Sequence, residues 1–359
     1  MTRKRVIKLI VLMVIMLVLF IFLNWFLIRT TTTAEMHIKY FYNEPENSMD
    51  VAIIGASEMY ADYSAPLAYK DYGYTGYNYC IEGIPGQLYL PMLETYLNRQ
   101  DPELVVIEVN GYLYPEEYCK REVNYRRLFD NIPFGAERNE LISKYVDPDE
   151  QLSYYLPIIK HHSNWQDIGY QAYRAKFLAE LEINGTSKTK SFGTRTTVNS
   201  KKKKYKRPNK HSLNDFNKQS LDDMISFLKD RGIENVLFIR APHKHKLEEG
   251  LSDELESIIT ASGYDYLNCE DIAKDEIGID KKTDYYNDEH LNVFGNEKFT
   301  RFLGGYIDSH YSLSKDHTEA VDKEWQECAD FTAELFEKLK VKTLKNEDEL
   351  YYEGNADRV

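Results

Sequence analysis

The sequence predicts an α/β protein in which helices cover both faces of a mostly parallel sheet, preceded by one transmembrane helix. Short apolar runs alternate along the chain with segments of helical spacing, and this alternation is typical of a parallel sheet. Because strand–helix–strand connections are right-handed, we expect a three-layer α/β/α arrangement. This domain is placed at residues 48–312, with an insertion at residues 111–210.

An N-terminal apolar run is expected to anchor the chain in a membrane. Residues 9–26 read LIVLMVIMLVLFIFLNWF, and extension to Ile28 gives about 20 residues, enough for a hydrocarbon core of roughly 30 Å. The run is long for a signal-peptide core and no A-x-A site follows it, which favours an uncleaved signal anchor over a cleaved signal peptide. Basic residues gather before the run, so the N-terminus is predicted to be cytoplasmic and the main domain extracytoplasmic.

The remaining boundaries follow from composition. Residues 1–30 form the cytoplasmic stub and the anchor, and residues 31–47 are expected to be a short polar tether. Residues 313–359 are expected to form a C-terminal helix that packs on the domain, followed by a frayed acidic tail from residue 346.

The elements of the domain are predicted from hydrophobic spacing. Strands are expected at residues 51–54, 77–81, 104–109, 235–241 and 264–267. Helices are expected at residues 87–98, 213–229, 251–262, 296–307 and 315–345. Regularity fades between residues 111 and 210, which we interpret as a long insertion or lid.

Composition excludes some functions and leaves others open. The net charge of −13 argues against a nucleic-acid partner. The 29 tyrosines suit either a sugar-stacking groove or half-wet core positions. The four cysteines have no metal-like spacing, and free buried thiols and a Cys80–Cys269 bridge both remain open. No metal or cofactor is expected. Arg240, at a strand end, either reaches the crevice or, as we expect, forms a surface ion pair.

A serine follows the first predicted strand. Gly55-Ala56-Ser57 lies at the carboxyl end of that strand, where ligands bind in open α/β sheets. Ser57 would then stand at a helix N-terminus, either as a nucleophile or as an ordinary N-cap. The second strand is followed by a stiff turn from Gly83 to Gly86, which is either a source of oxyanion-binding N–H groups or an ordinary loop.

A histidine stands among polar residues just before the last helix of the domain. The run Asn287-Asp-Glu-His290-Leu-Asn-Val-Phe-Gly295 suits a general base whose imidazole needs an orienting partner.

Together these segments resemble the SGNH (GDSL-like) hydrolase superfamily, in its membrane-anchored extracytoplasmic branch associated with polysaccharide O-acylation. The resemblance is carried by IIGAS, the Gly-Gln turn and HLN-x-x-G. It implies an SGNH or flavodoxin-like fold, Ser57 as nucleophile and His290 as base. It also implies that the oxyanion hole is built from Gly86, or less favourably Gly83, together with Asn110.

Two positions depart from the pattern of that superfamily. Strict alignment on the third strand would put Tyr112, rather than Asn110, in the oxyanion hole. The acidic residue expected three positions before His290 is Asn287, which could orient the imidazole through its carbonyl oxygen but has no charge to stabilise imidazolium. We expect Asp288, or else Asp284, to supply that charge, unless the site works as a Ser–His dyad or is slow.

The resemblance implies an extracytoplasmic serine esterase or O-acyltransferase, with acetyl as the expected acyl group and a cell-surface polysaccharide or wall polymer as the acceptor. A multi-pass membrane O-acyltransferase is the expected protein partner. The alternative is a weak or inactive SGNH-fold module that binds glycan or serves as a scaffold for a membrane acylation complex. A basic cluster at residues 201–210 is either a solvated loop or a contact for anionic lipid or polymer.

Overall fold

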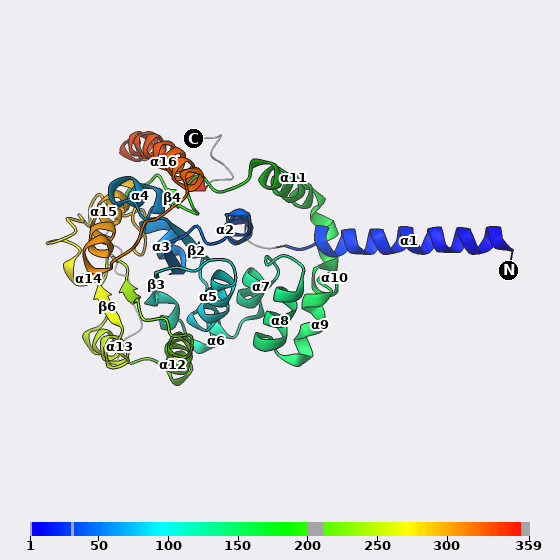
Figure 1. Ribbon diagram of the computed structural model, residues 1–359, viewed down its shortest axis with the longest axis horizontal. Coiled ribbons are helices and arrows are strands. Elements are labelled where there is room, and N and C mark those ends of the chain that lie inside the picture. The colour runs from blue at the N-terminus through cyan, green and yellow to red at the C-terminus, as the bar shows by residue number, and fades with distance from the viewer. Residues whose placement is uncertain (1, 30–31, 200–211, 353–359) are drawn as a thin grey trace.

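The computed structural model describes residues 2–29, 32–199 and 212–352, and its centre is a five-stranded sheet (Figure 1). The strand order is β2 (Gly76–Cys80), β1 (Val51–Gly55), β3 (Leu104–Glu108), β5 (Val236–Arg240) and β6 (Asp265–Asn268). All four pairings are parallel. The predicted α/β class with a mostly parallel sheet is therefore confirmed, and each strand lies within two residues of its predicted position.

The central strands are apolar because they are covered on both faces. Every residue of β1, β3 and β5 is buried, as expected for inner strands of a parallel sheet. Helices from distant parts of the chain pack on the sheet and on one another. They include α3 (Ser57–Asp62), α4 (Ala65–Tyr72), α5 (Tyr89–Leu97), α12 (Asp215–Asp230), α13 (Glu249–Ala261), α14 (Cys269–Ile272) and α15 (Val293–His310).

The expected tether is wrong, because residues 32–43 form a helix that belongs to the core. Helix α2 (Thr32–Asn43) packs on β2. Phe41 is fully buried and stacks on Tyr96, with ring centroids 4.8 Å apart. The Nδ1 atom of His37 lies 2.8 Å from the carbonyl oxygen of Cys80, and burial lowers the pKa of this histidine to about 4. The many charged and polar residues of this segment made its apolar face difficult to recognise in the sequence.

The insertion is helical rather than irregular. It holds 3-10 helix η2 (Val109–Leu113), helices α6 (Glu116–Cys119), α7 (Glu122–Phe129), α8 (Ala136–Tyr145), α9 (Pro148–Tyr155) and α10 (Ile158–His161), η3 (His162–Asp167) and α11 (Ile168–Asn184). Strand β4 (Gly193–Arg195) follows. Buried ion pairs join the short helices, since Asp130 contacts Arg126 at 3.1 Å and Arg138 at 3.3 Å. Short helices held by such contacts leave little hydrophobic periodicity in the sequence.

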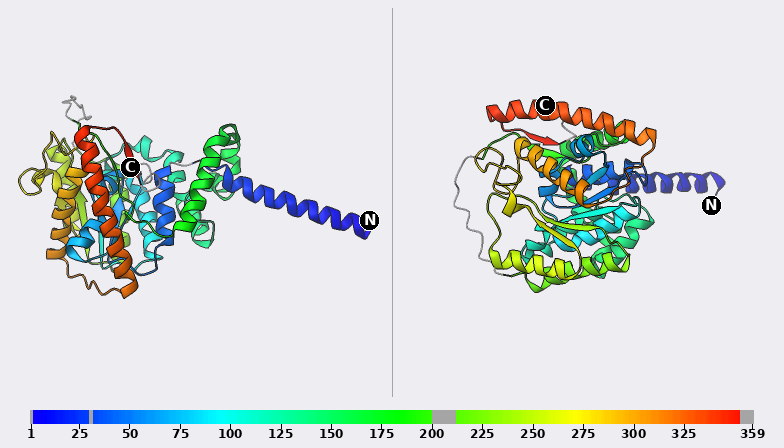
Figure 2. Two further views of the ribbon diagram at one scale, coloured as in Figure 1. Left: turned by 90° about the horizontal axis from the view of Figure 1, so that it is seen from above. Right: turned by 60° about the vertical axis from the view of Figure 1, so that its left-hand side comes forward.

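The C-terminal segment is ordered further than expected. Helix α16 (Glu319–Lys345) packs against α4 and α15, which confirms its predicted docking (Figure 2). Beyond it, β7 (Leu350–Tyr352) pairs antiparallel with β4, so residues 350–352 are not frayed. The remaining tail residues, 353–359, lie outside the described residues, as does the basic cluster at residues 201–210.

Helix α1 (Arg3–Phe26) projects from the domain, and in the described part of the chain it alone is long and apolar enough to span a membrane. Its 18-residue apolar window is unburied, whereas Leu27 and Ile28 just beyond it are buried in the domain. The four cysteines are buried and none of them is in a disulfide, so the Cys80–Cys269 bridge is absent.

Candidate active site

Ser57 and His290, which are 233 residues apart in the chain, lie side by side at the carboxyl edge of the sheet. Strand β1 ends at Gly55, and Ser57 opens α3. His290 stands in the loop before α15, next to the bridge between Tyr285 and Leu291. The Oγ atom of Ser57 is 2.7 Å from Nε2 of His290. The predicted serine–histidine pair is therefore within hydrogen-bond reach.

Asn287 sets the orientation of His290. Its Oδ1 atom accepts hydrogen bonds from the backbone N–H groups of Glu289 and His290, each at 2.8 Å. The same oxygen lies 3.0 Å from Nδ1 of His290. Because Oδ1 is an acceptor, Nδ1 carries the proton, and Nε2 is left with a lone pair for the Ser57 hydroxyl. This is the tautomer that a serine nucleophile requires.

The expectation that Asp288 or Asp284 supports the histidine is wrong. The Oδ1 atom of Asp288 instead accepts a hydrogen bond from Nδ2 of Asn199 at 2.9 Å. Asp284 is held by Lys298 at 2.6 Å and by the backbone N–H of Asp280 at 2.8 Å. Asn287 reaches the ring because its side chain closes a tight local turn, whereas these carboxylates point to other loops.

His290 is placed to accept a proton. The side chain is 8% exposed, and the ring of Tyr286 stacks on it with a centroid distance of 5.3 Å. Burial lowers the pKa of His290 below its usual 6.5, although the charge of Glu58 opposes this shift. The imidazole is therefore neutral near pH 7 and has its basic nitrogen directed at Ser57.

Asn110, and not Tyr112, is the polar residue of η2 that enters the site. Its Oδ1 atom accepts a hydrogen bond from Nη1 of Arg240 at 2.7 Å, which turns Nδ2 toward Glu58. The second hydrogen of Nδ2 has only a weak contact, with the Tyr114 hydroxyl at 3.5 Å. Tyr112 is fully buried and packs its ring edge-on against Tyr89. The amide of Asn110 thus retains one donor for a ligand.

Gly86 lies beside this segment in a position that only glycine fits. A Cβ atom there would stand 2.3 Å from the ring of Tyr112. Gly86 begins the 3-10 helix η1 (Gly86–Leu88), so its N–H has no partner within the helix. Gly83, the less favoured candidate, adopts φ +59°, and its carbonyl oxygen accepts a hydrogen bond from the Tyr118 hydroxyl at 2.7 Å.

Glu58 is the functional candidate that the sequence analysis missed. It directly follows Ser57, is 1% exposed and has its Oε2 atom 3.5 Å from the Ser57 Oγ atom. Its other oxygen accepts the hydrogen bond from Asn110 Nδ2. A buried carboxylate thus bridges the serine and the amide, at a position where surface exposure would be the default for glutamate.

Glu58 belongs to a buried polar cluster behind the serine. His243 places Nε2 3.8 Å from Glu58 and Nδ1 3.2 Å from Glu270. Arg240 contacts Glu270 at 2.9 Å and Glu108 at 3.6 Å. The expectation of a surface ion pair for Arg240 is wrong, since its side chain is 0% exposed. We refer to Glu58, Glu108, Arg240, His243 and Glu270 as the carboxylate cluster.

The carboxylate cluster has no net charge when Arg240 and His243 are charged and one of its three carboxyl groups is protonated. Burial disfavours the charged form of Glu58, but the neighbouring His243 and His290 outweigh it and lower its pKa. Burial and the charge of Glu58 raise the pKa of Glu108 to about 8. Burial opposes ionisation of His243 too, yet Glu270 and Glu58 raise its pKa. These shifts favour the ionised form of Glu58 and the protonated forms of His243 and Glu108.

The cluster was hidden from sequence analysis because its members are spread from residue 58 to residue 270. One signal was available. Glu58, Glu108 and Arg240 all stand at the carboxyl ends of neighbouring strands, where parallel topology brings side chains together.

Comparison of the chain with models of protein families, with curated proteins and with solved structures finds no match. The chemical interpretation of the site therefore rests on its geometry.

Proposed function

We propose that the protein is a serine esterase or O-acyltransferase with Ser57 as nucleophile and His290 as general base. The observation that carries the proposal is the 2.7 Å contact between Ser57 Oγ and His290 Nε2, with Nδ1 held by Asn287. A partly buried serine–histidine hydrogen bond with an oriented imidazole is the arrangement that activates a hydroxyl for acyl transfer.

In the first step, Ser57 Oγ attacks the carbonyl carbon of an acyl ester while its proton passes to His290 Nε2. The negative charge that develops on the carbonyl oxygen would be met by the N–H of Gly86 and the remaining hydrogen of Asn110 Nδ2. When the tetrahedral intermediate collapses, the donor alcohol leaves with the proton from His290. The acyl group then remains on Ser57.

In the second step, His290 takes a proton from the acceptor, whose oxygen attacks the acyl carbon. Water as acceptor gives hydrolysis, and a sugar hydroxyl gives transfer. Collapse releases the acid or the new ester, and Ser57 regains its proton from His290.

Glu58 takes the electrostatic role that the missing triad acid would have. Asn287 orients the imidazole but has no charge to offset imidazolium. The charge of Glu58 favours protonated His290 from the Ser57 side of the ring. The arrangement is a serine–histidine–asparagine triad assisted by an adjacent carboxylate.

The proposed fold is of the SGNH type, with helices in two layers around the sheet. Support comes from the order of the site residues, because the serine follows β1, the glycine turn follows β2, Asn110 follows β3 and the histidine precedes α15. This is the order on which the resemblance to that superfamily was based.

The proposed setting is the outer face of a cell membrane, with the N-terminus cytoplasmic and the domain held by α1. Support comes from the basic residues before α1 and the single Arg29 after it. Cell-surface polysaccharide or wall polymer is the proposed acceptor, acetyl the proposed acyl group, and a multi-pass O-acyltransferase the proposed partner.

A glycan-binding module or scaffold is the alternative, and one observation favours it. Asn110 already donates to Glu58, so the oxyanion hole is partly occupied in this conformation. Such a module would retain the fold and bind glycan without reacting at Ser57.

The test is labelling of the full chain by a fluorophosphonate, together with hydrolysis of p-nitrophenyl acetate and of an acetylated polysaccharide. The proposal expects labelling and ester cleavage that Ser57→Ala abolishes, while Ser309→Ala, at an exposed hydroxyl on α15, retains both. Absence of labelling in the parent protein would favour the binding module. Equal activity in Ser57→Ala would refute the proposed nucleophile.

A further inference from the structure

We infer that residues 158–174, which form α10, η3 and the first part of α11, lie in the membrane interface as a collar around the outer end of α1. Figures 1 and 2 both show these elements beside the end of α1 that enters the domain. We call residues 158–174 the membrane collar. The inference requires that α1 spans a bilayer, and it is independent of the chemistry proposed for Ser57.

The collar is joined rigidly to the last turn of α1. The Oδ1 atom of Asn24 accepts a hydrogen bond from the backbone N–H of Ile158 at 3.1 Å. Asn164 donates to the carbonyl oxygen of Leu27 at 2.9 Å, and Arg174 donates to that of Trp25 at 3.1 Å. These carbonyls at the end of a helix lack partners within it, and the collar supplies them. The domain therefore stays at a fixed height on the anchor.

The length of α1 brings the bilayer up to the collar. The stretch from Val6 to Leu23, apolar at every position except Lys8, holds 18 residues and is about 27 Å long at about 1.5 Å per residue. A hydrocarbon core of roughly 30 Å needs this whole stretch. The first collar contact, at Asn24, comes one residue later. The collar must then lie within the headgroup layer, with no aqueous gap between it and the lipid.

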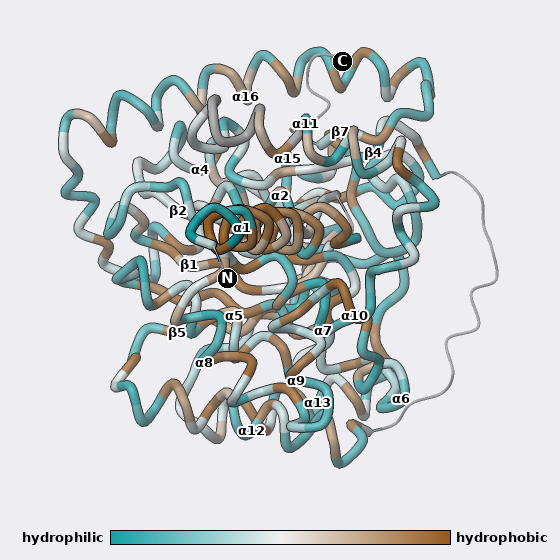
Figure 3. The backbone as a smooth tube through the Cα atoms, turned by 90° about the vertical axis from the view of Figure 1, so that its right-hand side faces the viewer, coloured by the Kyte–Doolittle hydropathy of each residue, from teal (hydrophilic) through white to brown (hydrophobic). Residues whose placement is uncertain are grey.

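The collar exposes the side chains that such a position favours. Trp165 is 64% exposed and Ile168 is 66% exposed. Ile159 and Tyr173 are also exposed, at 43% and 41%. Each stands within two residues of a residue that contacts the end of α1 or pairs with Arg29, so all four lie near the point where α1 leaves the domain. Figure 3 views the molecule from the side on which α1 projects. Tryptophan and tyrosine prefer the membrane–water interface.

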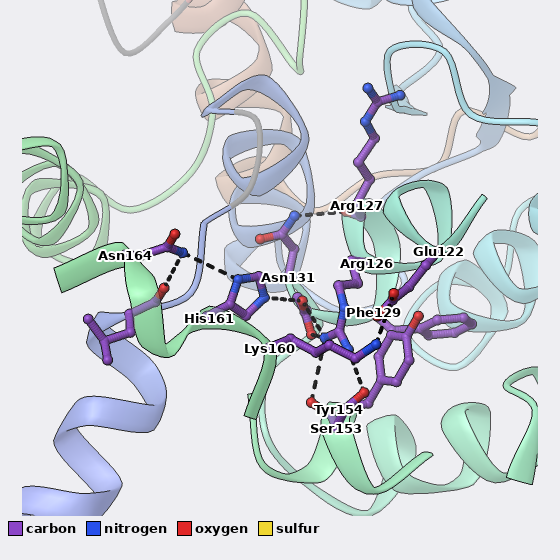
Figure 4. Close-up of polar contacts among 12 residues, drawn as sticks. Glu122, Arg126, Arg127, Phe129, Asn131, Ser153, Tyr154, Lys160, His161 and Asn164 are labelled. Atoms are coloured by element: carbon purple, nitrogen blue, oxygen red, sulfur yellow. Dashed lines mark hydrogen bonds and ion pairs between the residues drawn. The ribbon is translucent and has the colours of Figure 1, made fainter. Parts of the chain in front are cut away.

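The charges near the collar are paired within the protein. Lys160 contacts Glu122 at 3.1 Å and Glu150 at 3.0 Å, and His161 contacts Asp130 at 3.0 Å (Figure 4). Arg29 pairs with Asp167 at 3.5 Å. With the cations of this face neutralised by carboxylates, the apolar and aromatic side chains should supply the attraction to the membrane. The contact should therefore depend little on anionic lipid.

The experiment places a bimane fluorophore on single cysteines of the full chain in phosphatidylcholine vesicles that carry two nitroxide lipids, one labelled near the headgroup and one deep in the acyl chain. Ile168→Cys tests the collar, Leu17→Cys reports on α1, and Leu344→Cys is the aqueous control. Leu344 is 76% exposed at the end of α16, which points away from α1. The four native cysteines are buried, and the parent chain measures their background labelling.

We expect quenching at position 168 by the label near the headgroup, quenching at position 17 by the deep label, and none at position 344. Replacing part of the lipid by phosphatidylglycerol should leave quenching at position 168 unchanged. If position 168 behaves like position 344 while position 17 is quenched, the collar is in water and the inference is wrong. If position 17 is not quenched either, α1 does not span the bilayer, and the inference loses its premise. If position 168 is shielded from water only when another membrane protein is added, the exposed surface of the collar binds that protein and not lipid.

Discussion

The Oδ1 atom of Asn287 lies 3.0 Å from Nδ1 of His290, in the place where a triad carboxylate would stand. Two backbone N–H groups share this oxygen, so its position is fixed before any substrate binds. The geometry of a triad is thus present without its charge, and the consequences can be measured.

Asn287→Asp should raise kcat. Aspartate has the same shape and can accept the same three hydrogen bonds, and its charge would stabilise the imidazolium formed during attack. The reverse change in a serine protease lowers kcat by about 10⁴, and the gain here should be smaller because Glu58 already offsets part of the charge. The added charge should also raise the pKa of His290, so the acidic limb of the kcat/KM profile should move to higher pH.

The control for this prediction is Asp288→Asn. Asp288 follows Asn287 in the chain, but its carboxylate accepts a hydrogen bond from Asn199 and does not contact His290. Its pH profile should match that of the parent. A drop in kcat for Asn287→Asp, with the fold intact, would show that the neutral amide is required.

Glu58→Gln should lower kcat/KM by about tenfold or more, because it removes the charge that stabilises protonated His290. A tenfold loss corresponds to about 1.4 kcal/mol of electrostatic stabilisation. Glutamine can still accept the hydrogen bond from Asn110, so the change removes charge while retaining shape. Without that charge the pKa of His290 should fall further, and the acidic limb should move to lower pH. The measurement is the pH dependence of ester hydrolysis.

Glu289→Gln is the matched control for Glu58→Gln. Glu289 also raises the pKa of His290 through its charge, but it is partly exposed to water, which screens that charge. Its replacement should have a smaller effect. Equal losses in the two variants would mean that the contact between Glu58 and Ser57 has no special role.

Glu108→Gln should change how stability depends on pH. Burial and Glu58 raise the pKa of Glu108 from 4.5 to about 8, so the folded protein holds this proton where the unfolded chain releases it. The contribution of Glu108 to the free energy of unfolding therefore falls as pH rises from about 4.5 to about 8. Glutamine carries no titrating proton, and the variant should gain stability relative to the parent across this window.

Thermal unfolding of the full chain in micelles, followed by circular dichroism from pH 5 to pH 8, measures this difference. Glu337→Gln, at a side chain that is 74% exposed, should give a profile parallel to that of the parent. A constant difference between Glu108→Gln and the parent would show that Glu108 is ionised throughout.

The place of Ser57 could be predicted because parallel strands present their carboxyl ends at one edge. Its meeting with His290, which does not directly follow a strand, was implied by the resemblance of both segments to one superfamily. The strands themselves were readable because both of their faces are buried, which leaves continuous apolar runs. Asn110 was identified by its distance from β3, although Tyr112 fitted the alignment better. Only packing decided between them, since Tyr112 is needed against Gly86.

The carboxylate cluster and helix α2 could not be predicted, because both depend on contacts between residues that are distant in the sequence. Glu58 and Arg240 are charged, and charge in a sequence indicates surface unless a partner is known. Glu58 contacts His243, which is 185 residues away, and Arg240 contacts Glu108, which is 132 residues away. Helix α2 was missed for a similar reason, because its apolar face is short and its neighbours on β2 are tyrosines rather than a visible hydrophobic stripe.

Arg174→Ala should destabilise the junction between α1 and the domain. The guanidinium makes a bidentate contact with Glu35, with Nη2 at 2.5 Å and Nε at 2.8 Å, and both side chains are at least 96% buried. Replacing Arg174 removes the guanidinium from a buried carboxylate, and breaking a buried ion pair in this way costs about 3–5 kcal/mol. It also leaves the carbonyl oxygen of Trp25 without this donor.

The control is Arg195→Ala, which breaks an exposed pair with Asp348 between side chains that are 47% and 59% exposed. Exposed pairs contribute about 0–1 kcal/mol, so this variant should unfold at nearly the parent temperature. Limited proteolysis of both variants in vesicles should then show a new cut between α1 and α2 in Arg174→Ala alone. If Arg174→Ala resists proteolysis like the parent, the junction does not depend on this ion pair, and the contacts of Asn24 and Asn164 with the membrane collar are sufficient to hold α1 in place.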